Sequence, residues 1–245
     1  MKRLTAIVLT VILILGFTAC GGGDAENKPP SDLKESPASD FEYKYNAELK
    51  GIEITKYIGT SIRVRIPEKI EGEPVTSIGI NAFYNNGIME VYIPNSVTSI
   101  GAQAFLGCTG LTNITIPNSV MNIRAGAFRG CTGLTNITIS NKLMSIGGGS
   151  LENGGGAFQN CTGLTNITIP DSVTEIGGSA FSGCTGLTSI TIPDSVTSIG
   201  SQVFYNCTGL TSITYKGKTY SGDSVVFSFY KEVFGYEDVE AEAAW

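Results

Sequence analysis

The stretch CTGLTSITIPDSVTSIGSQVF, residues 184–204, decides the fold because close copies of it recur along the chain. Each copy carries a cysteine at the same place, and successive cysteines lie 23, 30, 23 and 23 residues apart. These cysteines are Cys108, Cys131, Cys161, Cys184 and Cys207. A leucine and a phenylalanine, such as Leu187 and Phe204, recur with the same spacing. Repeats of about 20 to 50 residues are typical of solenoids, in which similar coils stack along one axis.

Within one coil, the side chains of residues 190–192 (Ile-Thr-Ile) alternate between apolar and polar. This alternation predicts a short strand with both isoleucines facing the core. Pro193 ends the strand because proline cannot donate a hydrogen bond to a neighbouring strand. Val196 and Ile199 are expected to return to the core before the chain bends at Gly200. One such coil cannot bury enough apolar surface to fold alone, so the coils must stack.

The clearest copy reads Leu111-x-x-Ile114-x-Ile116-Pro117-x-x-Val120-x-x-Ile123, followed by Ala127-Phe128-x-x-Cys131. This pattern resembles the leucine-rich repeats of the surface antigen BspA and of treponemal surface proteins, over about Ser61 to Lys216. The resemblance implies a mainly β repeat solenoid. Its form is a right-handed leucine-rich-repeat superhelix with a parallel concave sheet and short turns or helical pieces on the other side. We therefore expect about seven coils in residues 61–216.

The coil that begins at Thr132 departs from the repeat. Ser140 replaces the usual proline, Leu143 replaces the usual valine, and seven extra residues lie within the glycine-rich stretch 147–156. This stretch lacks the Lys-Ser/Thr ending of a phosphate-binding loop. We expect it to form a loop on the rim of the solenoid.

The two ends of the repeat region differ from the coils, as solenoid caps must. Residues 41–60 contain two alternating stretches and are expected to form an N-terminal cap hairpin. Residues 217–245 are expected to form a C-terminal cap that ends in an acidic tail. The aromatic-rich segment from Val225 to Phe234 would cover the last coil.

The first residues of the chain have the features of a secretory signal. Lys2 and Arg3 precede an apolar run, which closes with small residues before Cys20. The run is short for a membrane span, which needs about 20 apolar residues. The ending resembles the lipobox of bacterial lipoproteins, which implies that residues 1–19 are removed and that Cys20 carries the lipid. The alternative is an ordinary signal peptide with a chance cysteine.

Residues 20–40 are rich in glycine, proline, serine and charged residues, so we expect them to form a lipid-anchored flexible linker. The linker would join the solenoid to the membrane. The resemblance to lipoproteins therefore implies a location in the bacterial cell envelope, and we expect the protein to be lipid-anchored and surface exposed.

The composition argues against catalysis and against nucleic-acid binding. The chain contains no histidine, which excludes Ser-His-Asp triads, Cys-His pairs and histidine metal ligands. Its net charge of −6 and lack of a basic patch disfavour nucleic-acid binding. We therefore expect a protein that is not an enzyme and that has no cofactor, no metal site and no nucleic-acid partner.

Two further patterns have structural explanations that outweigh the functional ones. The repeat cysteines are expected to be buried thiols, since parallel side chains on stacked coils converge poorly for disulfides or zinc. Asp171 and Asp194 are one period apart, but asparagine occupies the equivalent position in other coils. A role in capping turns explains that exchange better than a catalytic carboxylate pair.

The outward-facing strand positions form two rows, which are mostly Asn, Ser and Thr. The N-terminal end of these rows differs because it contains arginine, glutamate and tyrosine, and Tyr and Arg are favoured anchors of protein interfaces. The candidate partner-binding residues are therefore Arg63, Arg65, Glu90, Tyr92, Asn113 and Thr115. The alternative is that terminal coils vary simply because they meet a cap.

These features favour a cell-surface adhesion or recognition protein that binds macromolecules through its strand face. The resemblance to BspA-like proteins implies host extracellular-matrix or plasma proteins as partners, such as fibronectin and fibrinogen, or surface molecules of other bacteria. The alternative function is a passive structural or antigenic spacer without a dedicated ligand. Near-identical coils fit that alternative because repeats can expand by duplication.

Overall fold

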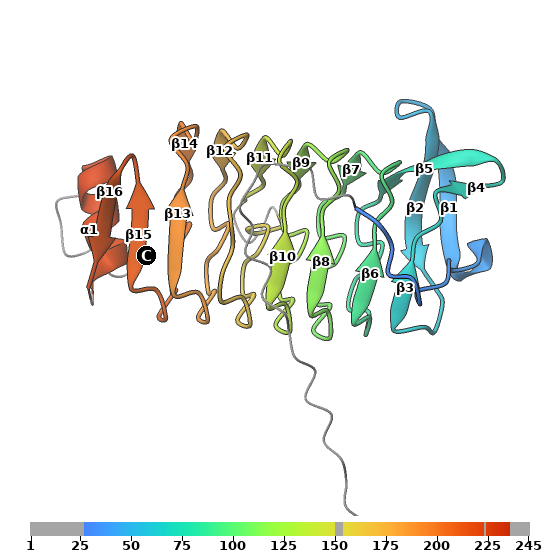
Figure 1. Cartoon of the computed structure of the whole chain (residues 1–245), viewed down its shortest axis with the longest axis horizontal. Helices are drawn as coiled ribbons and strands as arrows, with labels where there is room; N and C mark the ends of the chain where they lie inside the picture. Colours follow the sequence, from blue (N-terminus) through green and yellow to red (C-terminus); the bar gives the residue numbers. More distant parts are fainter. Residues whose placement is uncertain (1–26, 150–153, 223, 236–245) are drawn as a thin grey trace, which may run out of the picture.

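The computed structural model describes residues 27–149, 154–222 and 224–235 of the chain. They form an elongated solenoid of about seven coils, whose axis is horizontal in Figure 1. The leucine-rich-repeat architecture predicted from the sequence is confirmed.

The first row of strands follows the predicted Ile-x-Ile positions. The row contains β3 (Arg63–Arg65), β6 (Glu90–Tyr92), β8 (Asn113–Thr115), β10 (Asn136–Thr138), β13 (Ser189–Ile192) and β15 (Ser212–Tyr215). Neighbouring strands within β3–β10 and within β13–β15 pair in parallel, with equivalent repeat positions in register. The parallel sheet expected from the repeat is therefore present (Figure 1). Its outward side is called the strand face below.

A second row of short parallel strands runs along another side of the coils, where the sequence predicted turns and helical pieces. The row contains β5 (Glu73–Ile78), β7 (Ser99–Ile100), β9 (Asn122–Ile123), β11 (Ser145–Ile146), β12 (Glu175–Ile176) and β14 (Ser198–Ile199). Most of these strands have two residues, which is too short for alternation to reveal from sequence. Turns occupy the third side of the coils, as at residues 102–107.

The core contains a column of phenylalanines, one from each coil except the last, which carries β15. Phe105 and Phe128 stack with ring centroids 5.2 Å apart, and Phe128 and Phe158 stack at 5.5 Å. Tyr57 of the N-terminal cap extends the column by stacking on Phe83 at 5.3 Å. Because each ring packs on the coils before and after it, the column joins neighbouring coils into one core.

The repeat cysteines lie beside this column as free, buried thiols, as the sequence predicts. The thiol of Cys108 donates to the carbonyl of Phe83 at 3.0 Å, and that of Cys131 donates to the carbonyl of Phe105 at 3.1 Å. Burial raises the pKa of Cys108 to about 12. Each thiol therefore acts as a small apolar side chain that links its coil to the preceding one.

Both ends of the solenoid are closed by additional elements. At the N-terminus, β1 (Phe41–Asn46) and β2 (Gly51–Tyr57) pair antiparallel, β2 joins β5, and β4 (Lys69–Ile70) pairs with β5 from the side. At the C-terminus, β16 (Lys218–Ser221) pairs antiparallel with β15, and helix α1 (Val225–Phe234) follows. Phe229 of α1 is fully buried and meets the ring of Phe204 edge-on at 6.0 Å. The aromatic column therefore ends against the C-terminal helix.

Residues 27–40 differ from the flexible linker expected for residues 20–40. Leu33 is buried, the Ser36 N–H donates to the Arg65 carbonyl at 2.9 Å, and residues Ala38–Asp40 form the 3-10 helix η1. Residues 27–37, called the strap below, run over β3 and β6 as the blue trace in Figure 1. The polar composition of this segment predicts a flexible chain, but Leu33 and a few hydrogen-bonding groups such as Ser36 are enough to dock it on β3 and β6. Residues 20–26 of the expected linker lie outside the described residues.

Candidate functional site

The strand face has two different parts, one covered by the strap and one open. The candidate residues on β3 and β6 lie under or beside the strap, whereas those on β8 are exposed. The sequence predicted one continuous exposed cluster, and the structure instead divides it between these two parts.

Arg63 forms ion pairs with two carboxylates. Its Nε lies 2.5 Å from Glu90 Oε2, and its Nη1 lies 2.9 Å from Asp32 Oδ2 of the strap. The hydrogen bond from Arg63 lowers the pKa of Asp32, and the hydrogen bonds to both carboxylates raise the pKa of Arg63. The charges of Arg63 and Glu90, which were predicted to contact a partner, are therefore largely used in ion pairs within the chain.

Arg65 and Tyr92 are the most thoroughly covered of the candidates. The guanidinium carbon of Arg65 lies 5.8 Å from the centroid of the Tyr92 ring, within the range of a cation–π contact. The backbone N–H of Arg65 donates to Ser36 Oγ at 3.2 Å, and the Tyr92 hydroxyl donates to the Asn27 carbonyl at 3.2 Å. Tyr92 is 8% exposed, and burial is the main reason that its pKa is raised. A partner can reach these two side chains fully only when the strap moves.

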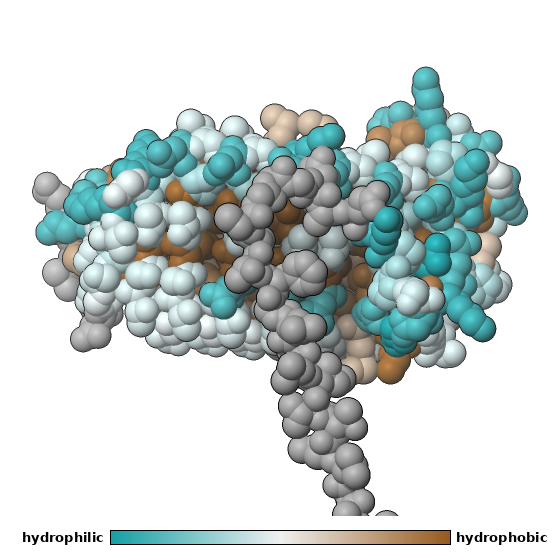
Figure 2. Space-filling view, in the orientation of Figure 1, coloured by the Kyte–Doolittle hydropathy of each residue, from teal (hydrophilic) through white to brown (hydrophobic). Residues whose placement is uncertain are grey.

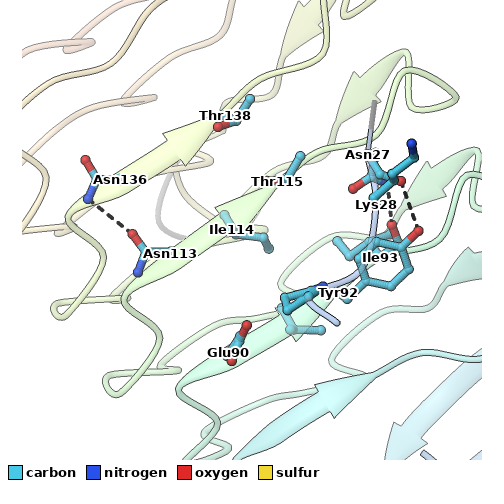
Figure 3. A pocket seen from close by; sticks show the side chains of 12 residues that line it. Asn27, Lys28, Glu90, Tyr92, Ile93, Asn113, Ile114, Thr115, Asn136 and Thr138 are labelled. Carbon is cyan, nitrogen blue, oxygen red and sulfur yellow. Dashed lines mark hydrogen bonds between the residues drawn. The ribbon is translucent and has the colours of Figure 1, made fainter. Parts of the chain in front are cut away.

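Asn113 and Thr115 begin the open part of the face. Asn113 Oδ1 accepts a hydrogen bond from Asn136 Nδ2 at 3.1 Å, so the amides of adjacent coils are linked (Figure 3). Exposed polar residues without charge continue the two rows along the solenoid: Asn136, Thr138, Asn166, Thr168, Ser189 and Thr191. The open face is a regular, neutral array of hydroxyl and amide groups on stacked coils, with strands on either side of residues 164–170, which form no strand.

A groove lies beside this array at the ends of β8 and β10, where the chain turns at Ile116-Pro117 and at Ile139-Ser140. We call it the corner groove, and it is lined by residues 115–119 and 138–142, with Asn27 and Lys28 of the strap at one end. It encloses about 670 Å³, and an adjoining hollow of about 210 Å³ lies between the strap and strands β6, β8 and β10 (Figure 3). Where the face is visible in Figure 2, hydrophobic surface lies in a lengthwise depression between paler polar rims.

The strap enters this groove through Asn27. The Asn27 side-chain amide donates to the Ile93 carbonyl at 2.8 Å and to Asn95 Oδ1 at 3.1 Å (Figure 3 shows the bond to Ile93). Neither the strap nor the groove was predicted from the sequence. The proline after the strand in most coils was the available signal, because it interrupts the hydrogen-bond ladder at that corner.

The other candidate features do not form a chemical centre. Asp171 and Asp194 lie exposed in turns after the strand positions. Within residues 27–149, 154–222 and 224–235, no group of three or more Cys, Asp or Glu side chains is placed to hold a metal ion. Over the same ranges, no helix has the length and apolar character that crossing a bilayer requires. Cys20, the predicted lipidation site, lies outside the described residues.

Comparison with solved structures finds bacterial leucine-rich-repeat proteins. The T. pallidum leucine-rich repeat protein TpLRR is 32% identical with a TM-score of 0.73, and the match covers 83% of this chain and 98% of TpLRR. A leucine rich cell surface protein from Faecalibacterium prausnitzii is 31% identical with a TM-score of 0.55. A leucine-rich repeat protein from Bacteroides ovatus is 28% identical, also with a TM-score of 0.55.

The match to the F. prausnitzii protein covers 78% of this chain and 56% of that protein, and the match to the B. ovatus protein covers 74% and 53%. This chain therefore spans about half the length of those two proteins. No curated protein sequence matches the chain. The family model for the BspA type leucine rich repeat region matches residues 76–155 and 154–234 with six copies. The repeat, the fold and these matches agree that the chain belongs to the BspA-type leucine-rich-repeat family.

Proposed function

We propose that this protein is a lipid-anchored recognition protein of the bacterial cell surface, which binds a macromolecule through the open part of its strand face. The observation that carries the proposal is the regular array of exposed amides and hydroxyls from Asn113 to Thr191. Stacked coils hold these groups in fixed positions, so binding orders few side chains beyond those already linked. Proteins of this repeat type are generally binding scaffolds without catalytic activity.

The open part of the face is large enough to take part in a protein interface. It spans the four coils from Asn113 to Thr191, roughly 19 Å at about 4.8 Å per coil. A standard interface needs about 800 Å² from each partner, so the rims beside the open part would contribute as well. The neutral side chains also agree with a partner that is held by hydrogen bonds and shape rather than by charge attraction.

The N-terminal sequence supports a location at the cell surface. In this proposal, residues 1–19 direct export and Cys20 carries the lipid, as in the lipoproteins whose lipobox the sequence resembles. The F. prausnitzii protein with the same fold is described as a cell surface protein. Host matrix or plasma proteins and surface molecules of other bacteria are the partners that we propose to test.

The experiment is a solid-phase binding assay with residues 21–245, which leave out the lipidated Cys20, keep the strap and are called the mature chain below. Immobilised fibronectin, fibrinogen, other matrix proteins, glycans and whole bacteria form the panel. The proposal expects saturable binding to at least one member. It also expects this binding to fall with Asn136→Arg, which places a long cation on the open face, and to persist with Asn122→Arg on the second row of strands.

A passive spacer remains the second candidate, and the near-identical coils favour it. A folded mature chain that binds no member of the panel would support the spacer and contradict the recognition function. Binding that Asn122→Arg and Asn136→Arg reduce equally would instead show that the strand face is not the binding surface.

A further inference from the structure

The strap is a polypeptide segment already bound to the recognition surface, and its contacts show which chemistry the corner groove accepts. Asn27 presents its backbone carbonyl to the Tyr92 hydroxyl and its side-chain amide to the Ile93 carbonyl and Asn95 Oδ1. Leu33 and Ser36 hold the rest of the strap on β3. The strap has a turn at residues 31–32, and its first residue binds here through one carboxamide side chain and one backbone carbonyl.

The Ile93 carbonyl accepts this amide because the solenoid does not supply its usual donor. In the parallel ladder, the Ile116 N–H donates to the Thr138 carbonyl at 2.8 Å, so the ladder reaches the corner in one direction. The return bond to the Ile93 carbonyl would come from the backbone nitrogen of Pro117, which has no hydrogen. The strap amide takes that place at 2.8 Å.

Proline stands at the same repeat position in later coils. Beyond β10 the strand ladder is interrupted, because residues 164–170 form no strand. The residue equivalent to Pro117 in that coil is Pro170, and one coil further on it is Pro193. Neither proline has an N–H, so the repeat creates further corner carbonyls that need a donor from outside the ladder. Ile139 lies in the lining of the corner groove, about two coils beyond the corner that Asn27 occupies.

The position at the Ile139 carbonyl favours a neutral donor. A carboxylate has no hydrogen to donate to this carbonyl, and Lys28 and Lys142 at the groove disfavour a second cation. The hydroxyl of Thr138 and the half-buried Ile139 side chain leave space for a neutral polar side chain on a narrow backbone. Asparagine and glutamine supply two N–H donors without charge, which matches this lining.

We propose that the corner groove binds an extended polypeptide segment of the partner, with an asparagine or glutamine amide at the Ile139 carbonyl as Asn27 sits at Ile93. This inference rests on the proposed function and names the chemistry of its partner. Extended chain rises by about 3.3 Å per residue, and two coils span about 10 Å. About three residues of extended chain therefore span the distance between the Ile93 corner, where the strap ends, and the amide of the bound segment at the Ile139 corner.

The test uses the mature chain, residues 21–245, and a phage-displayed library of random 12-residue peptides as the probe. After selection, the binding of an enriched peptide is measured by fluorescence anisotropy. We expect enriched peptides to share an Asn or Gln, and an Asn→Asp or Gln→Glu version to bind about tenfold more weakly, because it leaves a buried acceptor unpaired.

Protein variants locate the site. Thr138→Trp fills the corner groove and is expected to abolish peptide binding, whereas Asn122→Trp places the same side chain on the second row and is expected to leave it unchanged. Thermal unfolding of both variants checks that they fold. Peptides without an amide preference, no enrichment at all, or equal binding by Thr138→Trp would each overturn the inference.

Two outcomes separate this inference from the proposed function. If a macromolecule from the panel binds and Thr138→Trp does not weaken it, the recognition function stands and the groove assignment fails. If sedimentation shows that the mature chain self-associates and Thr138→Trp makes it monomeric, the occupant is a second copy of this chain, which contradicts a partner peptide.

Discussion

Removing one ring from the aromatic column is expected to destabilise the whole solenoid. Phe128 is fully buried and stacks between Phe105 at 5.2 Å and Phe158 at 5.5 Å. Its carbonyl also accepts the Cys161 thiol at 3.1 Å. The change Phe128→Ala leaves a cavity between two coils whose rings are fixed by further neighbours, so the site cannot collapse easily.

We expect Phe128→Ala to lower the free energy of unfolding by about 3 to 5 kcal/mol, which is the range for replacing a buried phenylalanine with alanine. For a folded region of this size, that loss corresponds to a fall in Tm of roughly 6 to 20 °C. Urea unfolding followed by circular dichroism measures the free energy, and calorimetry measures Tm. Phe128→Leu is the matched control, since it keeps most of the buried volume and should cost less than about 1.5 kcal/mol.

The position of the damage is part of the prediction. Because each coil contacts mainly its neighbours, faster amide hydrogen exchange should centre on the coils that carry Phe105, Phe128 and Phe158 and decline toward both caps. A loss below about 1 kcal/mol for Phe128→Ala would refute the view that the column joins the coils. A uniform rise in exchange across the chain would refute the nearest-neighbour character of the stack.

Three further predictions concern the thiols, the strap and the N-terminus. Burial raises the pKa of Cys108 from 9.0 to about 12, so the folded state disfavours its thiolate. Stability that is present below pH 9 should therefore fall as the pH rises toward 12, measured as Tm against pH, and a constant Tm from pH 8 to 10.5 would contradict this. Leu33→Asp should release the strap, so that trypsin cuts after the exposed Lys34 faster than it does in the wild type. The control is Glu35→Gln at an exposed position, and equal cleavage rates for the two variants would argue against a docked strap. Cys20→Ser should move the protein from the membrane fraction to the soluble fraction of expressing cells, and unchanged fractionation would exclude a lipid on this residue.

The repeat region was predictable because its signal is redundant. The same pattern of apolar residues recurs in each coil, so positions such as Leu111, Ile114 and Phe128 could be assigned to the core from their spacing alone. The second row of strands was not predictable in the same way. A pair such as Ser145–Ile146 extends only because its neighbours in adjacent coils are extended, and this is a property of the stack rather than of the local sequence.

The candidate site was predicted only in part. The rows through Asn113 and Thr115 are exposed as expected, because they follow directly from the alternation in the strands. The covering of Arg65 and Tyr92 could not be foreseen from composition, because it depends on one leucine and a few hydrogen bonds in a polar segment. A double replacement of Arg65 and Tyr92 therefore perturbs the strap as well as any partner contact, so it is a poor test of binding.

A matched pair of variants shows most directly whether the open strand face is the recognition surface. The measurement is the Kd of the mature chain for the panel member that it binds, by biolayer interferometry, for wild type, Asn136→Arg and Asn122→Arg. Both asparagines are exposed strand residues, one on the open face and one on the second row. We predict that Asn136→Arg weakens binding at least tenfold while Asn122→Arg leaves Kd unchanged. Equal Kd values for wild type and Asn136→Arg would contradict the account.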